Sequence, residues 1–347
     1  MRRPTGLRST LIATCLLLSQ TTGLLGQRDL RELRDRAEEG NPAAQFNLAR
    51  LYVSGTGVPQ DDLEAVRWYR LAAAQGHTAA QHNLGLRYDL GSGVDEDDEE
   101  AVRWYRLAAD QGHWEAQFRL GRMYADGTGI ERNDAAAVDW YRRAADQGHA
   151  EAQYSLGQMY FNGRGVARNR AEAAQWVTRA ARLGNSTAQI TLASMYERGA
   201  GVPVDEALAF RWYHLAAVQG DPTAQVTLGY LYDAGTGVTE DDEEAIRWIR
   251  RAADQSNAEA QFALGNMYLN GRGVAPDPSE AVQWTRLAAE QGLPRAQFNL
   301  GMSYDTGTGV DPDPAEAARW FRRAAEQGEA AAQQNLGVMY ANGDGVP

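Results

Sequence analysis

The segment NPAAQFNLARLYVSGTGVPQDDLEAVRWYRLAAAQG, residues 41–76, decides the fold because it returns along the chain at an interval of 36 residues. The Gln of Ala-Gln recurs in this way from Gln45 to Gln333, and the Tyr series that begins at Tyr52 keeps the same interval. Self-similarity at one fixed period is the signature of a repeat architecture. The length of 347 residues therefore indicates a repeat array rather than two globular domains.

Each unit is predicted to hold two helices. Asn41 is a favourable N-cap for the first helix, and Gly55 ends it because glycine readily adopts the left-handed conformation found past helix ends. Asp61 begins the second helix, with Glu64 three residues later as an acidic form of the capping box, and Gly76 ends it. Each helix should span about 13 residues, or roughly 20 Å.

The apolar residues of both helices fall on one face. Ala44 and Leu48 share a face of the first helix, and Trp68 shares one with Ala65 and Ala72 in the second. One helical hairpin cannot bury such faces, but stacked neighbours can, so the sequence predicts an all-α solenoid of 36-residue helix-turn-helix repeats. We expect the Trp series to be structural and to fill the space between helix pairs. Its members are Trp68, Trp104, Trp140, Trp176, Trp212, Trp248, Trp284 and Trp320.

The composition excludes several classes of function. All 34 basic residues are Arg, against 46 acidic residues and a net charge of −12, which makes the chain a poor partner for nucleic acid. Without Lys there is no Schiff-base lysine, Ser-Lys dyad or P-loop lysine, and one Cys cannot form an internal disulfide or a cysteine zinc site. We predict no catalytic residue, no metal site and no cofactor, and no later segment is apolar enough to span a membrane.

Residues 1–26 are predicted to be a signal peptide. Arg2, Arg3 and Arg8 form a positive start, and an apolar run from Leu11 to Leu18 follows. The protein is therefore expected to be exported to the periplasm or secreted, or to enter the lumen of the endoplasmic reticulum if the host is eukaryotic. The single Cys of the chain, Cys15, lies within this run, and we interpret it as an ordinary signal-peptide residue rather than a lipidation site.

The ends of the array differ from its middle. Residues 27–40 are predicted to form a polar N-terminal capping helix, because Glu32 stands where Trp is expected. Residues 41–347 then hold eight full units and an incomplete ninth, which lacks its second helix. Either the chain is a fragment, or the last helix frays or docks on a partner.

Two groups of polar residues could suggest chemistry. His77, His113 and His149 share one repeat position at a helix start, where helix capping is favoured over metal binding because stacked units place such positions about 10 Å apart. Asp95–Glu100 and Glu240–Glu244 are acidic runs without the ligand order of a calcium loop. Stabilisation of a helix N-terminus by negative charge explains them better.

The pattern also resembles the Sel-one-like repeat (SLR) family, a relative of the tetratricopeptide repeat. Ala-x-x-Leu-Gly-x-x-Tyr, Gly-x-Gly-Val, Asp-x-x-x-Ala-x-x-Trp and Ala-Ala-x-x-Gly are the matching motifs, over about residues 41–347. Within residues 121–148 they are carried by Gly121, Tyr124, Gly127, Gly129, Trp140, Ala144, Ala145 and Gly148. The resemblance implies a right-handed superhelix that binds proteins and is usually not catalytic.

A variable face of the first helices is the candidate binding surface. Positions equivalent to 43, 47 and 50 fall on one side, away from Ala44 and Leu48. An ordinary solvated face remains the alternative for any one residue. A basic stripe on the second helices, which includes Arg67, could clamp carboxylates or pair within the chain, and we favour pairing. The candidate partner-binding residues are Glu115, Arg119, Arg122, Thr191, Ser194, Thr227, Tyr230 and Asn299.

These features predict a non-enzymatic scaffold or adaptor that binds a peptide or partner protein in the groove of the solenoid. The resemblance implies work in signalling, secretion, or envelope and protein quality control. One alternative is a β-lactam-binding or β-lactam-hydrolysing enzyme, as linked to cysteine-rich SLR relatives, although this chain lacks their paired cysteines. The other is a structural spacer in an envelope complex. The identity of the partner and the oligomeric state stay open.

Overall fold

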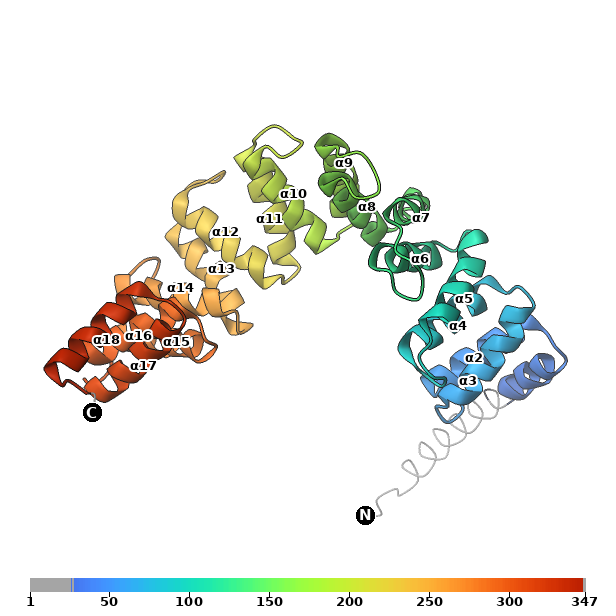
Figure 1. The fold of residues 1–347 in the computed structure, drawn as a ribbon, viewed down its shortest axis with the longest axis horizontal. Helices are drawn as coiled ribbons and strands as arrows, with labels where there is room; N and C mark the ends of the chain where they lie inside the picture. The colour runs from blue at the N-terminus through green and yellow to red at the C-terminus, as the bar shows by residue number, and fades with distance from the viewer. Residues whose placement is uncertain (1–25, 27, 346–347) are drawn as a thin grey trace, which may run out of the picture. The chain divides into compact units, whose positions relative to one another are not determined.

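The computed structural model describes residue 26 and residues 28–345, so almost all of the predicted signal peptide lies outside the described residues. These residues form helices joined by turns and contain no strand, and residues 28–38 form the first helix. The later helices, labelled in Figure 1, are α2 (Pro42–Ser54), α3 (Asp62–Ala74), α4 (Thr78–Leu90), α5 (Asp98–Asp110), α6 (Trp114–Asp126), α7 (Asp134–Asp146), α8 (Ala150–Asn162), α9 (Arg170–Arg182), α10 (Ser186–Arg198), α11 (Glu206–Val218), α12 (Pro222–Ala234), α13 (Asp242–Asp254), α14 (Ala258–Asn270), α15 (Pro278–Glu290), α16 (Pro294–Thr306), α17 (Pro314–Glu326) and α18 (Ala330–Asn342).

The chain divides into two compact units, Met1–Arg168 and Asn169–Pro347. Within each unit, the first helix of a repeat packs against the second helix of the same repeat, and that second helix packs against the next first helix. The pairs α2·α3 and α3·α4 illustrate the pattern in one unit, as do α12·α13 and α13·α14 in the other. The predicted all-α solenoid of 36-residue repeats is confirmed.

The helix ends are capped as the residue types predict. Asn41 Oδ1 accepts the backbone N–H of Ala44 at 2.9 Å, and Asp61 Oδ1 accepts that of Glu64 at 3.0 Å. Gly55 follows α2 with a φ of 67°, where an L side chain would be strained. Each of these caps gives a buried or half-buried polar group at a helix end its partner.

The Trp series differs in burial from one repeat to the next. Trp68, Trp176, Trp248 and Trp320 are buried, whereas Trp104, Trp140, Trp212 and Trp284 are only half-buried. The guanidinium of Arg143 lies 4.3 Å from the ring centre of Trp140, at cation–π distance. The Trp position therefore lies at the rim of the core rather than wholly inside it.

Glutamine side chains connect neighbouring repeats. Gln45 Nε2 donates to the carbonyl of Ala37 at 3.0 Å, and Gln75 Nε2 donates to Gln45 Oε1 at 2.8 Å. The same pair of bonds recurs one repeat later at Gln81 and Gln111. The buried amide of Gln45 thus donates one hydrogen bond to the backbone of the preceding segment and accepts another from Gln75, at the end of the second helix of its own repeat.

An arginine–tyrosine series makes a second connection. Arg70 donates to Tyr88 Oη at 2.8 Å, and Arg106 donates to Tyr124 Oη at 2.8 Å. The neighbouring Arg of the basic stripe, such as Arg67, pairs with an acidic residue of its own helix start, here Glu64 at 3.2 Å. Pairing within the chain, which the sequence favours, is the arrangement seen for Arg67.

The two ends of the array are unlike. Leu30, Leu33 and Ala37 of the first helix pack on the core of the first repeat, with Ala37 buried. In α18, Met339 is buried, but Val338 is 52% and Tyr340 50% exposed.

Candidate functional site

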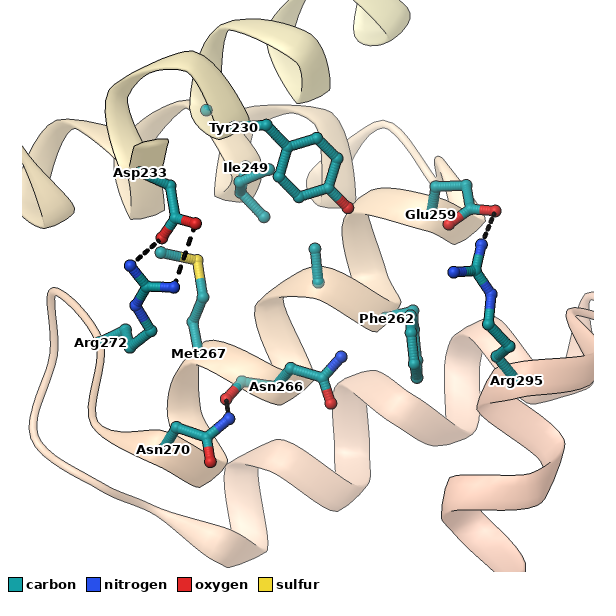
Figure 2. Close-up of a pocket in the computed structure, with 12 residues that line it drawn as sticks. Tyr230, Asp233, Ile249, Glu259, Phe262, Asn266, Met267, Asn270, Arg272 and Arg295 are labelled. Carbon is teal, nitrogen blue, oxygen red and sulfur yellow. Dashed lines mark hydrogen bonds and ion pairs between the residues drawn. The ribbon is translucent and has the colours of Figure 1, made fainter. Parts of the chain in front are cut away.

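A pocket of about 430 Å³ opens on the first helices of three consecutive repeats. Its side chains come from α12, α14 and α16, with one from α13 and one from the loop after α14 (Figure 2). Because first helices repeat with one register, the same positions of neighbouring repeats meet here. All of the pocket lies within the unit Asn169–Pro347.

Apolar side chains form the middle of this pocket. Tyr230 of α12 and Phe262 of α14 stand on opposite sides of it, and Ile249 and Met267 lie between them and the Asp233 end (Figure 2). Tyr230 lines the pocket, and 46% of the residue is exposed. An exposed aromatic beside a concave apolar surface is the usual composition of a recognition site.

Ion pairs flank the pocket at both ends. Arg272 Nη2 lies 2.7 Å from Asp233 Oδ1 at one end, and Arg295 Nη2 lies 3.5 Å from Glu259 Oε1 at the other (Figure 2). The Arg295 side chain is 65% exposed and that of Glu259 is 47% exposed, so this pair is open to solvent. An exposed pair contributes little to stability, which leaves both charges available to a ligand.

Amide and hydroxyl groups complete the lining. Asn270 Nδ2 donates to the backbone carbonyl of Asn266 at 2.8 Å, and the Asn266 side-chain amide points into the pocket (Figure 2). Burial, and next the negative charge of Glu259, raise the pKa of Tyr230 above its usual range. The Tyr230 hydroxyl therefore stays protonated and can donate a hydrogen bond.

The repeat pattern matches one family throughout the array. The Sel1 repeat model matches residues 42–77, 78–113, 114–149, 150–185, 186–221, 222–257, 258–293, 294–329 and 330–347. The chain belongs to the Sel1 repeat family. Sel1 repeat proteins are typically protein-interaction scaffolds and are generally not enzymes.

Two crystal structures of Sel1 repeat proteins resemble the chain. One is a protective antigen present in uropathogenic Escherichia coli strains, with 40% identity, a TM-score of 0.85, and coverage of 90% of this chain and 67% of that one. The other is a Sel1 repeat protein from Oxalobacter formigenes, with 35% identity, a TM-score of 0.71, and coverage of 89% and 90%. No curated protein gives a significant match.

Two of the sequence-predicted binding residues lie at or beside the pocket of this Sel1 repeat array. Tyr230 lines it directly. Asn299 of α16 lines an adjoining pocket of about 320 Å³, and its Nδ2 lies 3.4 Å from Asn266 Oδ1, a residue that lines both. The two predicted residues thus belong to one continuous stretch of first-helix surface.

The three other candidates of this unit are less accessible than Tyr230. Thr191, Ser194 and Thr227 are half-buried. The Thr227 hydroxyl donates to the backbone carbonyl of Thr223 at 2.9 Å. A hydroxyl that bonds to its own helix in this way is partly withdrawn from a ligand.

The candidates of the other unit are occupied by ion pairs. Arg119 lies 3.1 Å from Glu115 and 3.6 Å from Asp89, and Arg122 lies 3.9 Å from Asp89. Glu115 also meets His149 Nε2 at 3.3 Å, and this hydrogen bond is the main cause that lowers the pKa of Glu115. These three residues of α6 form a charged network across Sel1 repeats, with Arg122 its most exposed member.

Three residues that make the pocket are not among those predicted from the sequence. Glu259 and Asn266 occupy positions equivalent to 43 and 50 in the repeat that follows the one with Tyr230. No candidate was taken from that repeat, although the 36-residue register points to both residues. Phe262 occupies a position that is apolar in most Sel1 repeats of this chain, so its sequence pattern is that of a core residue.

The three His at helix starts act as caps, as the sequence predicts. His77 Nδ1 accepts the backbone N–H of Ala80 at 3.2 Å, and His113 and His149 repeat this contact. Among the described residues, no three His, Cys, Asp or Glu side chains are grouped so that they could hold a metal ion. None of the described helices combines the length and apolarity needed to cross a membrane.

Proposed function

We propose that this chain is a non-enzymatic scaffold that holds a peptide or a segment of a partner protein on the face lined by its first helices. The pocket between Tyr230 and Phe262 is the observation that carries the proposal. It lies on the face that the sequence marks as variable, in a family whose members mediate protein interactions.

The chemistry of the pocket suits a peptide with a large apolar side chain. That side chain would enter between Tyr230 and Phe262, where it would be removed from water. The Asn266 amide would pair with the peptide backbone, because a side-chain amide both donates and accepts hydrogen bonds. Glu259 and Arg295 would then orient the polar groups that flank the apolar residue.

Peptide selection with defined variants tests this proposal. Peptides would be selected from a random display library on the purified full chain, and their affinities measured by fluorescence anisotropy. We expect Tyr230→Ala and Phe262→Ala each to weaken the selected apolar peptides at least about tenfold, a typical loss for an aromatic hot spot. Asn266→Ala should weaken them less.

Leu287→Ala is the matched control, because Leu287 is an exposed apolar residue of α15, a second helix, and does not line the pocket. This variant should bind with wild-type affinity, and circular dichroism should show equal helicity for all variants. Selected peptides that bind Tyr230→Ala as well as wild type would place the binding face elsewhere. Failure to select any peptide would argue against a peptide-binding scaffold.

We further propose that the protein is exported, and works in the periplasm, outside the cell or in the lumen of the endoplasmic reticulum. The support is the positively charged start and the apolar run from Leu11 to Leu18. Roles in signalling, secretion, or envelope and protein quality control are consistent with such a location. Fusion of residues 1–40 to alkaline phosphatase, which is active only after export, tests it. Phosphatase that stays inactive, while a fusion with a known leader is active, would contradict export.

A further inference from the structure

A second pocket lies in the other unit, between α2 and α4. Its volume is about 760 Å³, and its lining includes two guanidinium groups, from Arg50 and Arg87, together with the Tyr69 hydroxyl and the Asn83 amide. No Asp or Glu is among the residues that line it, although the chain as a whole carries a net charge of −12. The positive charge of this lining contrasts with the net negative charge of the chain and favours an anionic ligand.

The two guanidinium groups differ in how they are held. The Arg87 side chain is only 14% exposed, and its Nη1 lies 3.1 Å from Asp62 Oδ1. Its Nε is buried and has no hydrogen-bond partner in the described part of the chain. Because this atom is closed off from solvent, a ligand in the pocket would meet the part of the Arg87 side chain that remains exposed.

Arg50 is the free member of the pair. It is exposed, and it forms no ion pair among the residues that the structure describes. Its guanidinium lies 5.8 Å from the ring centre of Phe46, which is at the outer range of a cation–π contact. Burial raises the pKa of Tyr69, while the positive charges of Arg87 and Arg50 oppose this rise, so both guanidinium groups act on the same hydroxyl.

We propose that this pocket binds the side-chain carboxylate of an Asp or Glu in a partner peptide, between Arg50 and Arg87. The inference rests on the proposed function in that the ligand belongs to a polypeptide. Leu51 and Leu86 line the same pocket and would cover apolar residues on either side of the acidic one. Asn83 Nδ2 lies 3.1 Å from Tyr69 Oη, and these two polar groups of the lining would face the peptide backbone.

Charge balance favours a carboxylate over a phosphate. Asp62 neutralises one of the two guanidinium groups, which leaves one positive charge for the ligand. A carboxylate supplies one negative charge, whereas a phosphate monoester carries about −1.5 to −2 at neutral pH. Arg also matches the planar carboxylate in bidentate geometry.

The experiment extends the peptide selection. Sequences selected on the wild-type chain would be divided by whether their binding is lost in Arg50→Gln or in Tyr230→Ala. We expect a group that contains Asp or Glu next to Leu, Ile, Val or Met, that weakens at least about tenfold with Arg50→Gln, and that weakens with added salt. Arg67→Gln is the matched control, because Arg67 is 64% exposed on α3 and lies outside the pocket. It should change affinity less than about twofold.

Three synthetic versions of a selected peptide identify the anion. One keeps the internal Glu with an amidated C-terminus, one replaces Glu by Gln but has a free terminal carboxylate, and one replaces Glu by phosphoserine. The proposal expects the Glu peptide to bind most tightly. Preference for either of the other two, or selected peptides without acidic residues, or unchanged affinity in Arg50→Gln, would overturn it. Peptides that depend on Tyr230 alone would overturn this inference and leave the proposed function standing.

Discussion

Gln75 Nε2 lies 2.8 Å from Gln45 Oε1; Gln75 caps the C-terminus of the second helix of a repeat, and Gln45 lies in the first helix of the same repeat. Gln45 in turn donates to the carbonyl of Ala37 in the segment before it. Gln45 is buried, so its amide depends on these two bonds for its polar partners. The contact therefore ties three successive helices together through one side chain.

Replacement of Gln75 by Leu removes the donor and leaves Gln45 Oε1 buried without a partner. We expect the free energy of unfolding to fall by about 1–3 kcal/mol, the usual cost of such an orphaned group. Urea unfolding followed by circular dichroism measures it. The double variant Gln45→Leu with Gln75→Leu serves as the comparison, because loss of both partners should cost less than the sum of the two single changes. Simple additivity would contradict the coupling.

Ser256 is strained, and its replacement by Gly should stabilise the protein. It stands at the repeat end where the other units have Gly, and its φ is 64°, which is unfavourable for a residue with a side chain. The substitution relieves about 1–2 kcal/mol of backbone strain, but Gly also gives the unfolded chain more conformational entropy. The net increase in the free energy of unfolding should be roughly 0.5–1 kcal/mol. Thermal unfolding measures it. Gly220→Ser, at an equivalent end with open space for a Cβ, should lose a similar amount. A neutral Ser256→Gly would show that the turn tolerates Ser.

His82 should make stability fall at acidic pH. Burial is the main cause that lowers its pKa from 6.5 to about 4, and the His113 ring stacked 4.5 Å away adds repulsion. The unfolded chain takes up a proton below about pH 6.5, but the folded chain does so only near pH 4, so stability is lost as the pH falls between these values. Nearby Glu115 opposes this loss and Arg119 adds to it.

His82→Phe isolates this effect, because Phe occupies the same position in the two neighbouring repeats, at Phe46 and Phe118. Between about pH 7.5 and pH 5, the wild type should lose about 2 kcal/mol more than the variant. Urea unfolding at both pH values gives the difference. Equal losses would assign the acid sensitivity to other groups, such as His113, whose pKa burial also lowers.

The β-lactam alternative makes a direct prediction. After residue 26 the chain has neither Cys nor Lys, which removes a cysteine nucleophile and the lysine of a Ser-x-x-Lys site. We expect the purified protein to hydrolyse a chromogenic β-lactam no faster than the same protein unfolded by heat. Hydrolysis that depends on the folded state, and survives in independently purified variants, would show that the chain is an enzyme.

The helices were predictable because each boundary has its own local chemistry. Asn41, Asp61 and Gly55 begin and end helices through bonds that involve residues only a few positions away, so the sequence displays both partners together. The period of 36 then extended each boundary to every repeat. Stacking followed, because the apolar faces have no other cover.

The candidate pocket was only partly predictable. Tyr230, and Asn299 of the adjoining pocket, were found from the variable face, but Arg272 comes from a loop and reaches Asp233 through its side-chain conformation, which periodicity does not encode. Arg119 shows the opposite difficulty, since its ion pair with Asp89 of α4 depends on the distance between two repeats, whereas its partner Glu115 lies four residues away on the same helix. Helical position identifies which side chains face outward and leaves open which of them are already paired.

The glutamine hydrogen bonds determine which deletions and duplications such a repeat chain tolerates. Gln111 and Gln147 bond to partners 30 residues earlier, and Gln117 and Gln153 to carbonyls eight residues earlier, so equivalent residues use equivalent partners. Excision of residues 113–148 would bring His149 directly after Gly112, and Gln153 would find the Ala109 carbonyl that Gln117 had used. Loss or duplication of whole units thus preserves these glutamine bonds, whereas a change that is not a multiple of 36 residues breaks the register at once.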